Sequence, residues 1–377
     1  MKRSVLLSWQ ALLAAVLCLP ALSGVSVMLA EAPAQPAFAE ISAILVLLLG
    51  AVILSMSRFS RIVRVTALFA GAHGAAWFLI GLLGTNFGQA AAPYFCLVAA
   101  AWLLAWRAVS ELSDIEPQDR RTALALRLLI PAIFGAWVLV LWEAVTRGAG
   151  IPFVLLPPPS AIGARIATSL PILFDDVRQT IFKAVLIGYA IGCAAGFATA
   201  IIADKVSFLR RGLLPVGNFV SALPIIGVAP IMVMWFGFDW PSKAAVVIIM
   251  TFFPMLVNTV EGLTASGHME RDLMRTYAAS YWQTLFKLRL PAAMPFVFNA
   301  LKINSTLALI GAIVAEFFGT PIVGMGFRIS TEIGRMSLDM VWSEIAVAAL
   351  AGSVFYGIVA LIERAVTFWH PSMRGAR

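Results

Sequence analysis

The residues that could do chemistry in this chain lie in two neighbouring stretches. The first is the polar stretch 263–295, which separates two long apolar runs. Its apolar and polar side chains fall on separate stripes at helical spacing. The apolar stripe contains Leu273, Tyr277, Tyr281, Leu285 and Leu288, and the polar stripe contains Asp272, Arg275, Thr276, Gln283 and Lys287. Such a surface is too polar for a bilayer and too apolar for a solvated loop, so we expect it to lie against a membrane domain and bind a soluble partner.

A break of small residues, Ala278-Ala279-Ser280, divides this stretch into two short predicted helices. For a docking role, Tyr277, Ala278 and Trp282 would fit a groove on the partner, because a small side chain allows a close approach of backbones. A simpler interpretation is that the two helices are amphipathic interfacial helices that merely cover the bundle.

The second stretch surrounds Lys302, which lies about 16 Å along a helix that begins near Pro291 and therefore close to mid-bilayer. Asn299, Lys302 and Thr306 share one helical face, and Ser305 lies beside them. A lysine at this depth is costly unless it faces a polar interior. The face therefore either lines a pathway for an anionic or polar solute, or carries a lysine that snorkels to the interface or pairs with a carbonyl.

Catalytic, cofactor and metal sites are not indicated by the sequence. No lysine is followed by Ser or Thr, so the phosphate-binding G-x-x-x-x-G-K-[ST] loop is missing and this chain cannot supply a nucleotide site. The three cysteines, Cys18, Cys96 and Cys193, lie in apolar runs without C-x-x-C spacing, and the three histidines form no ligand motif. ATP hydrolysis, if it drives this protein, must come from another chain.

The elements that position these residues are membrane helices. Of the 377 residues, 61% are hydrophobic and 12% are charged, whereas a soluble domain has about 25% charged residues. The net charge of +8 does not indicate nucleic-acid binding, since Lys and Arg lie at the ends of the apolar runs. Several of these runs reach the spanning length of about 20 residues.

Ten spans are predicted, in an all-α fold. Their approximate limits are residues 1–30, 41–56, 65–83, 90–106, 128–145, 181–203, 213–236, 244–260, 296–318 and 342–362. Prolines 215, 224 and 230 are expected to break the seventh span, and residues 161–174 to form a short surface helix. The basic segments, except Arg328 and Arg335, alternate so that both termini are predicted to be cytoplasmic. The first segment is either a signal peptide or, as its length favours, a retained helix.

Four blocks in the second half resemble one family, the permeases of ABC importers for nitrate, sulfonates, taurine and thiamine precursors. The stretch DLMRTYAASYWQTLFKLRLPAAMP is similar to the family's cytoplasmic EAA loop, with Asp272 in place of Glu and Ala278 in place of Gly. The segments LLPPPSAIGARI, SALPIIGVAPIMVMWFGF and LALIGAIVAEFFG resemble three further family segments, in the same order. The resemblance covers residues 128 to about 370, and residues 1–110 have no recognised counterpart.

This resemblance implies a six-helix permease core at 128–377, preceded by a four-helix membrane extension at 1–112 and a cytoplasmic linker at 113–127. The loop at 264–291 would be the coupling helix that docks into an ATPase. Its expected contacts are Asp272, Arg275, Tyr277, Ala278, Trp282, Leu290 and Pro291, with Leu290-Pro291 fixing the start of the next membrane helix. The resemblance also implies ATP-binding cassette subunits, a periplasmic or lipid-anchored solute-binding protein and a second permease copy, all at a bacterial inner membrane and its lipid.

Three other classes remain possible from the residues. An ion-gradient-driven secondary transporter would have matching interruptions in its two halves and paired mid-span acids, and neither is present. A membrane enzyme would need a cluster of His, Asp or Cys. For the N-terminal helices alone, an assembly module and inert packing both remain open.

Overall fold

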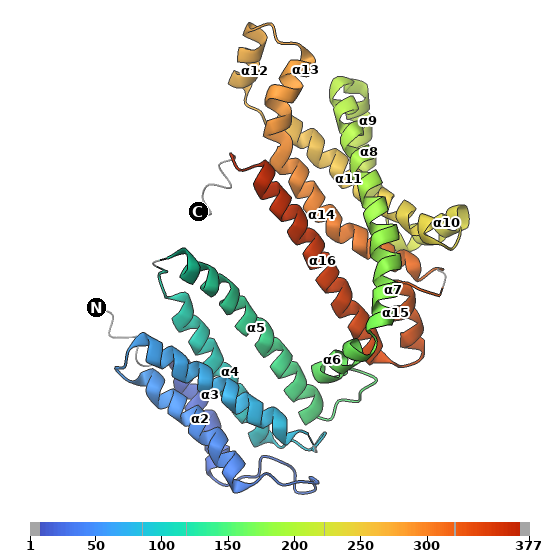
Figure 1. Ribbon diagram of the computed structural model, residues 1–377. Coiled ribbons are helices and arrows are strands. Elements are labelled where there is room, and N and C mark those ends of the chain that lie inside the picture. Colours follow the sequence, from blue (N-terminus) through green and yellow to red (C-terminus); the bar gives the residue numbers. More distant parts are fainter. Residues whose placement is uncertain (1–7, 85, 118, 222, 320–321, 370–377) are drawn as a thin grey trace. The chain divides into compact units, whose positions relative to one another are not determined.

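The computed structural model describes residues 8–84, 86–117, 119–221, 223–319 and 322–369 (Figure 1). The basic start and the end of the basic tail, which informed the predicted topology, lie outside these residues. The chain folds into two compact units, residues 1–163 and 164–377.

Eight of the helices in the described residues are long and apolar enough to cross a membrane. They are Phe38–Met56 (α2), Arg61–Leu82 (α3), Ala92–Ser113 (α4), Arg120–Gly148 (α5), Leu170–Lys205, Trp240–Thr264 (α11), Tyr281–Glu316 and Leu338–Val366 (α16). Two shorter apolar helices, Trp9–Leu22 (α1) and Ile225–Phe236 (α10), account for two further predicted segments. The prediction of an all-α membrane protein is therefore confirmed.

In the N-terminal unit, α1 packs on α4, and α3 packs on both α2 and α4. Helix α5 packs against α3 and α4, so this unit extends beyond the boundary predicted at 113–127. One buried carboxylate, Glu111 on α4, accepts from Arg64 at 3.1 Å and from Arg107 at 2.7 Å. Two guanidinium partners offset the cost of burying this carboxylate, since buried charges persist in proteins when they are paired.

The centre of the C-terminal unit is a three-helix contact of α8 (Leu186–Lys205), α11 and α14 (Leu290–Glu316). A ridge of small residues on α8, Gly188, Gly192 and Gly196, faces α11, and a side chain at any of the three would collide with α11 atoms. Close approach of backbones through small residues is the usual packing of membrane helices. The ridge is therefore a packing feature.

Two other predicted elements differ from the structure or refine it. The seventh span is broken into α9 (Ser207–Ser221) and α10, but at only one of the three predicted prolines, since Pro224 is the N-cap of α10 while Pro215 and Pro230 lie inside the two helices. The predicted surface helix at 161–174 is wrong in its second half. Helix α6 spans only Pro159–Thr168, and a new helix then runs from Leu170 through α7 (Leu170–Val177) and the π-helical segment η1 (Arg178–Val185) into α8. Pro171 occupies its first turn, where a proline favours a helix start.

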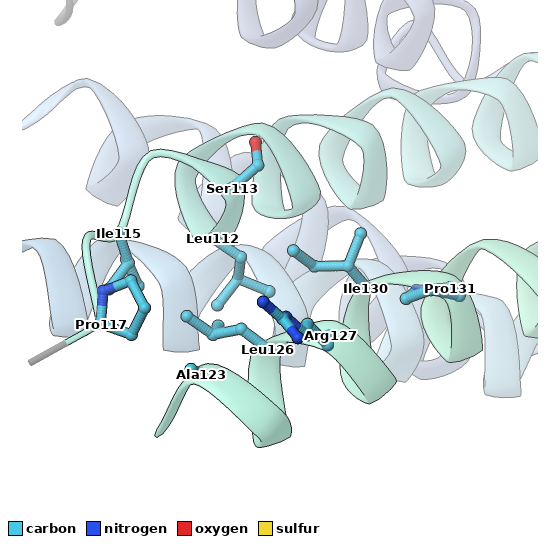
Figure 2. A pocket seen from close by; sticks show the side chains of 9 residues that line it. All are labelled: Leu112, Ser113, Ile115, Pro117, Ala123, Leu126, Arg127, Ile130 and Pro131. Carbon is cyan, nitrogen blue, oxygen red and sulfur yellow. The ribbon is translucent and has the colours of Figure 1, made fainter. Parts of the chain in front are cut away.

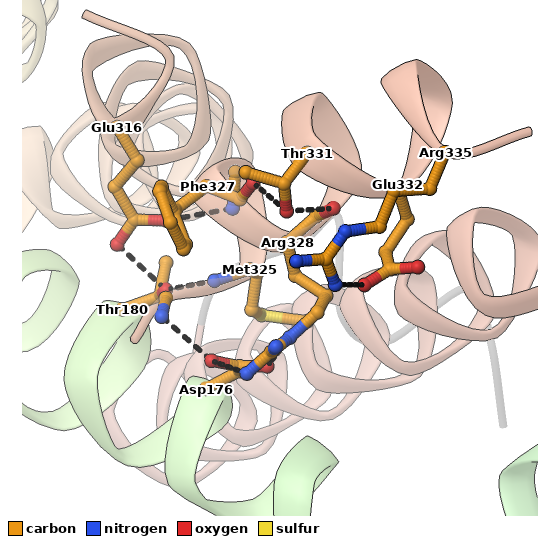
Figure 3. A network of polar contacts seen from close by, with 11 residues as sticks. Asp176, Thr180, Glu316, Met325, Phe327, Arg328, Thr331, Glu332 and Arg335 are labelled. Atoms are coloured by element: carbon orange, nitrogen blue, oxygen red, sulfur yellow. Dashed lines mark hydrogen bonds and ion pairs between the residues drawn. The ribbon is translucent and has the colours of Figure 1, made fainter. Parts of the chain in front are cut away.

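The Gly-rich connection after α14 contains a short helix, α15 (Met325–Gly334), whose first backbone N–H groups are capped by side chains (Figure 3). Asp176 accepts from Gly324 N at 2.6 Å, Thr180 from Met325 N at 2.9 Å and Glu316 from Gly326 N at 2.7 Å. A helix leaves its first N–H groups without internal partners, so these bonds fix α15 to α7, η1 and α14. Glu316 therefore has a structural role in this network.

An ion pair completes this network, since Arg328 Nε lies 2.8 Å from Asp176 Oδ2. Burial by itself would lower the pKa of Arg328, but the hydrogen bond and the charge of Asp176 together raise it.

We expect Gly192→Val to destabilise the protein strongly, because the added side chain would collide with Thr251 and Ile248 of α11. Overpacking of this kind costs about 1–3 kcal/mol. The matched control is Gly357→Val on α16, where a side chain meets nothing within 4 Å. Thermal unfolding in detergent should show a clear fall in melting temperature for the first variant only, and equal values for both variants would contradict the packing argument.

Candidate functional site

The polar stretch of the sequence forms two short helices, α12 (His268–Thr276) and α13 (Tyr281–Thr284), between α11 and α14. Figure 1 shows them at one end of the C-terminal unit, with α15 at the other end. Helix α12 has no buried residue. The stretch therefore projects beyond the apolar parts of α11 and α14 and is not enclosed among them, as a docking loop requires.

The turn between α12 and α13 depends on Ala278, whose φ of +52° lies in the left-handed region. Only glycine enters this region without steric cost, and the cost for other residues is roughly 1–2 kcal/mol. Alanine, whose side chain is a single methyl group, occupies the position at which the EAA-loop pattern of the family has Gly. Ser280 then caps α13, because its Oγ accepts from Gln283 N while Gln283 Oε1 accepts from Ser280 N at 2.8 Å.

The outer surface of the loop is apolar and exposed. Met269 is 84% exposed, Tyr277 77% and Trp282 49%. Trp282 stacks on Phe286 with ring centroids 5.9 Å apart, and Lys205 Nζ lies 5.6 Å from the Trp282 ring centroid. The indole is thus held from one side while half of it stays open, which is typical of aromatic anchors at protein interfaces.

The two predicted rim residues, Asp272 and Arg275, lie on α12 and contact each other at 3.5 Å. Their side chains are 70% and 84% exposed. An ion pair this exposed adds little stability, typically about 0–1 kcal/mol. Both groups therefore keep most of their capacity to bind a partner.

The loop is fixed to the bundle by a group of contacts that the sequence analysis missed. Arg289 donates from Nη1 and Nη2 to the Asp204 carboxylate at 2.8 and 2.6 Å, and from Nε to Leu263 O at 3.0 Å. Tyr281 Oη donates to Asp204 Oδ2 at 2.9 Å. A two-pronged guanidinium–carboxylate pair has a fixed geometry, so these contacts hold α13 and the start of α14 to the ends of α8 and α11. We call this group of four residues the loop clamp.

Leu290 and Pro291 are the first two residues of α14, but the membrane helix does not begin there. The π-helical segment η2 (Leu285–Arg289) joins α13 to α14 in one continuous helix. Leu290 packs on the buried cluster of Leu263, Leu285 and Ala293. Pro291 has no N–H group and cannot donate the usual helical hydrogen bond. The wider π turn just before it accommodates this missing bond.

The predicted pathway face is only partly brought together. Lys302 Nζ lies 2.7 Å from Glu363 Oε2 on α16, so its partner is a carboxylate and not a carbonyl. Asn299 and Thr306 are exposed on the same face, whereas Ser305 is fully buried and donates to Lys302 O. Nothing local in the sequence indicates Glu363, which is 61 residues away from Lys302 in the chain.

Comparison with known proteins matches residues 192–368 to the family described as the binding-protein-dependent transport system inner membrane component. The matched region contains the loop, the loop clamp and Lys302. Residues 192–368 are identified as a domain of this family of ABC-importer permeases. The chain is thus a permease component of an importer, and a secondary transporter is not favoured.

Individual relatives agree. The formylaminopyrimidine transport permease ThiX of Halalkalibacterium halodurans is 28% identical over 241 residues, which cover 64% of this chain and 96% of ThiX. The riboflavin transport permease RibX of Chloroflexus aurantiacus is 29% identical, covering 62% of this chain and 88% of RibX. The putative aliphatic sulfonate permease SsuC of Bacillus subtilis is 26% identical, covering 69% and 93%. These relatives are transport permeases and not enzymes.

We expect Ala278→Gly to stabilise the loop by about 1 kcal/mol, because glycine removes the cost of the left-handed backbone. Ala278→Val should have the opposite effect, since a β-branched side chain fits this region worse than alanine does. Hydrogen exchange of residues 268–289 measures the change directly. Slower exchange in the valine variant than in the glycine variant would contradict the assigned turn.

Proposed function

We propose that the loop at 264–291 is the coupling element through which a separate ATPase drives this permease. Its support is the apolar outer surface of Tyr277 and Trp282 on a loop that the clamp fixes to three membrane helices. An ATPase groove would bury these aromatic groups, and Asp272 and Arg275 would contact its rim. Movement of the docked loop would then pass through Arg289 and Asp204 to α8, α11 and α14 and open the pathway alternately to each side.

The assembly that we propose contains a permease dimer, two ATP-binding cassette subunits and a periplasmic or lipid-anchored solute-binding protein. It lies in the bacterial inner membrane with both termini in the cytoplasm. Membership of the importer family supports the ATPase and the binding protein. The basic segments of the sequence support the orientation.

The solute is proposed to be small and polar or anionic. Curated relatives are described as permeases for aliphatic sulfonates, taurine and nitrate, and others for formylaminopyrimidine and riboflavin. Lys302 supports an anion, because an ammonium group on the predicted pathway face attracts negative charge. Its ion pair with Glu363 would open as the solute binds.

Truncation of the docking surface tests the coupling role. We expect Trp282→Ala combined with Ala278→Arg to reduce solute-stimulated ATP hydrolysis and uptake at least ten-fold in the purified complex with its cognate ATPase. The first change removes an aromatic anchor, and truncating such anchors costs 2 kcal/mol or more. The second places a long charged side chain at the point of closest approach.

The matched control is Phe38→Ala, which removes an aromatic side chain that is 88% exposed in the other unit. It should leave coupling unchanged. Unchanged coupling in the Trp282/Ala278 double variant would refute the docking role.

Removal of the Lys302 charge tests whether its helical face lines the solute pathway. We expect Lys302→Gln to lower uptake of nitrate and of an alkanesulfonate about ten-fold or more, since a hydrogen bond to a charged group contributes about 1.5–3 kcal/mol. Formylaminopyrimidine serves as the uncharged comparison.

Because Lys302→Gln leaves Glu363 without its partner, a fold defect must be excluded. The double variant Lys302→Gln/Glu363→Gln replaces the ion pair by two neutral side chains and should regain stability without regaining anion uptake. Full anion uptake by this double variant would show that Lys302 has a structural role only.

A further inference from the structure

The N-terminal unit contains an open cavity at the end of two membrane helices. It lies where α4 ends, beside Ile115 and Pro117 of the connection to α5 and the first three turns of α5, and its volume is about 350 Å³. Both helices are long and apolar enough to span a membrane, so the connection between them lies at one membrane surface. A cavity here is open both to lipid and to the aqueous boundary.

The lining is apolar apart from one charge and one hydroxyl. It is formed by Leu112, Ser113, Ile115, Pro117, Ala123, Leu126, Arg127, Ile130 and Pro131 (Figure 2). The guanidinium of Arg127 lies near Leu112 and Leu126 in this view. Seven apolar residues beside one cation suit a ligand with an apolar part and an anionic part.

No carboxylate among the described residues pairs with Arg127, and none of the nine lining residues is acidic. The acidic residues near the cavity make contacts with other groups or are exposed. Glu111 is held by Arg64 and Arg107. Asp119 accepts from Thr122 N at 2.7 Å and caps α5. Asp114 and Glu116 are exposed, as are Arg120 and Arg121 in the first turn of α5, and none of these four residues lines the cavity, so the cation in the cavity is Arg127.

We propose that this cavity binds an anionic phospholipid. The acyl chain would lie against Leu112, Leu126 and Ile130, and the phosphate would accept hydrogen bonds from Arg127, whose planar guanidinium matches phosphate geometry. Basic pockets between membrane helices bind such headgroups. The same connection carries a second arginine contact, since Arg61 of α3 donates to Asp114 O at 2.9 Å and fixes the rim of the cavity.

Lipid retention by the full-length protein in complex with its ATPase tests the proposal. The delipidated complex is titrated with phosphatidylglycerol or with phosphatidylcholine, and native mass spectrometry counts the bound molecules. We expect preferential retention of phosphatidylglycerol, and an approximately five-fold loss of it in Arg127→Gln, the size of effect that one basic residue has on anionic lipid. Ala123→Phe fills the cavity and should reduce retention of the same molecule.

Arg121→Gln is the matched control, because Arg121 lies on the same helix, carries the same charge and is exposed like Arg127, but is outside the lining. The retention of phosphatidylglycerol by this variant should stay within two-fold of that by the unaltered protein. Equal losses of phosphatidylglycerol in Arg121→Gln and Arg127→Gln would mean that diffuse surface charge, and not the cavity, retains the lipid. Equal retention of the two lipids, or full retention of phosphatidylglycerol in Ala123→Phe, would overturn the proposal. None of these outcomes depends on the coupling role of the other unit.

Discussion

The pairing of Arg289 with Asp204 is the interaction on which the rest of the C-terminal unit depends. It connects the start of α14 to the end of α8, and Arg289 also contacts the carbonyl of Leu263 on α11. Both side chains are nearly buried, with exposures of 13% and 3%. Loss of one partner from a buried pair costs about 3–5 kcal/mol, because the other charge is then left uncompensated. An exposed loop fixed in this way can move only together with the three helices.

The same principle appears at the opposite end of the unit. There Asp176, Thr180 and Glu316 cap the N-terminus of α15, and Arg328 pairs with Asp176. Between the two polar ends, glycines of α8 allow it to pack closely on α11. Helices that are joined tightly at both ends and along their length move as rigid bodies, and rigid-body rotation is one established way to change access to a pathway.

The sequence predicted the elements well, because apolar length and proline placement are local signals. The ten apolar segments, the break in the seventh and the two-helix loop all followed from such signals. The continuation from Leu170 through α8 was missed because a π-helical segment has no clear sequence pattern. The pairings Asp204–Arg289 and Lys302–Glu363 were missed because they join residues 85 and 61 positions apart. Charge alone marks such residues as candidates but does not identify their partners.

A charge-reversal cycle on the loop clamp tests the central claim most directly. Asp204→Arg and Arg289→Asp are compared singly and together in the reconstituted complex, with the ratio of solute transported to ATP hydrolysed as the readout. Each single variant should lose most of this ratio while basal ATP hydrolysis persists, and the double variant should recover at least part of it because the ion pair is restored with its signs exchanged. Single variants that keep the full ratio would contradict the claim that movement passes from the loop to the helices through this pair.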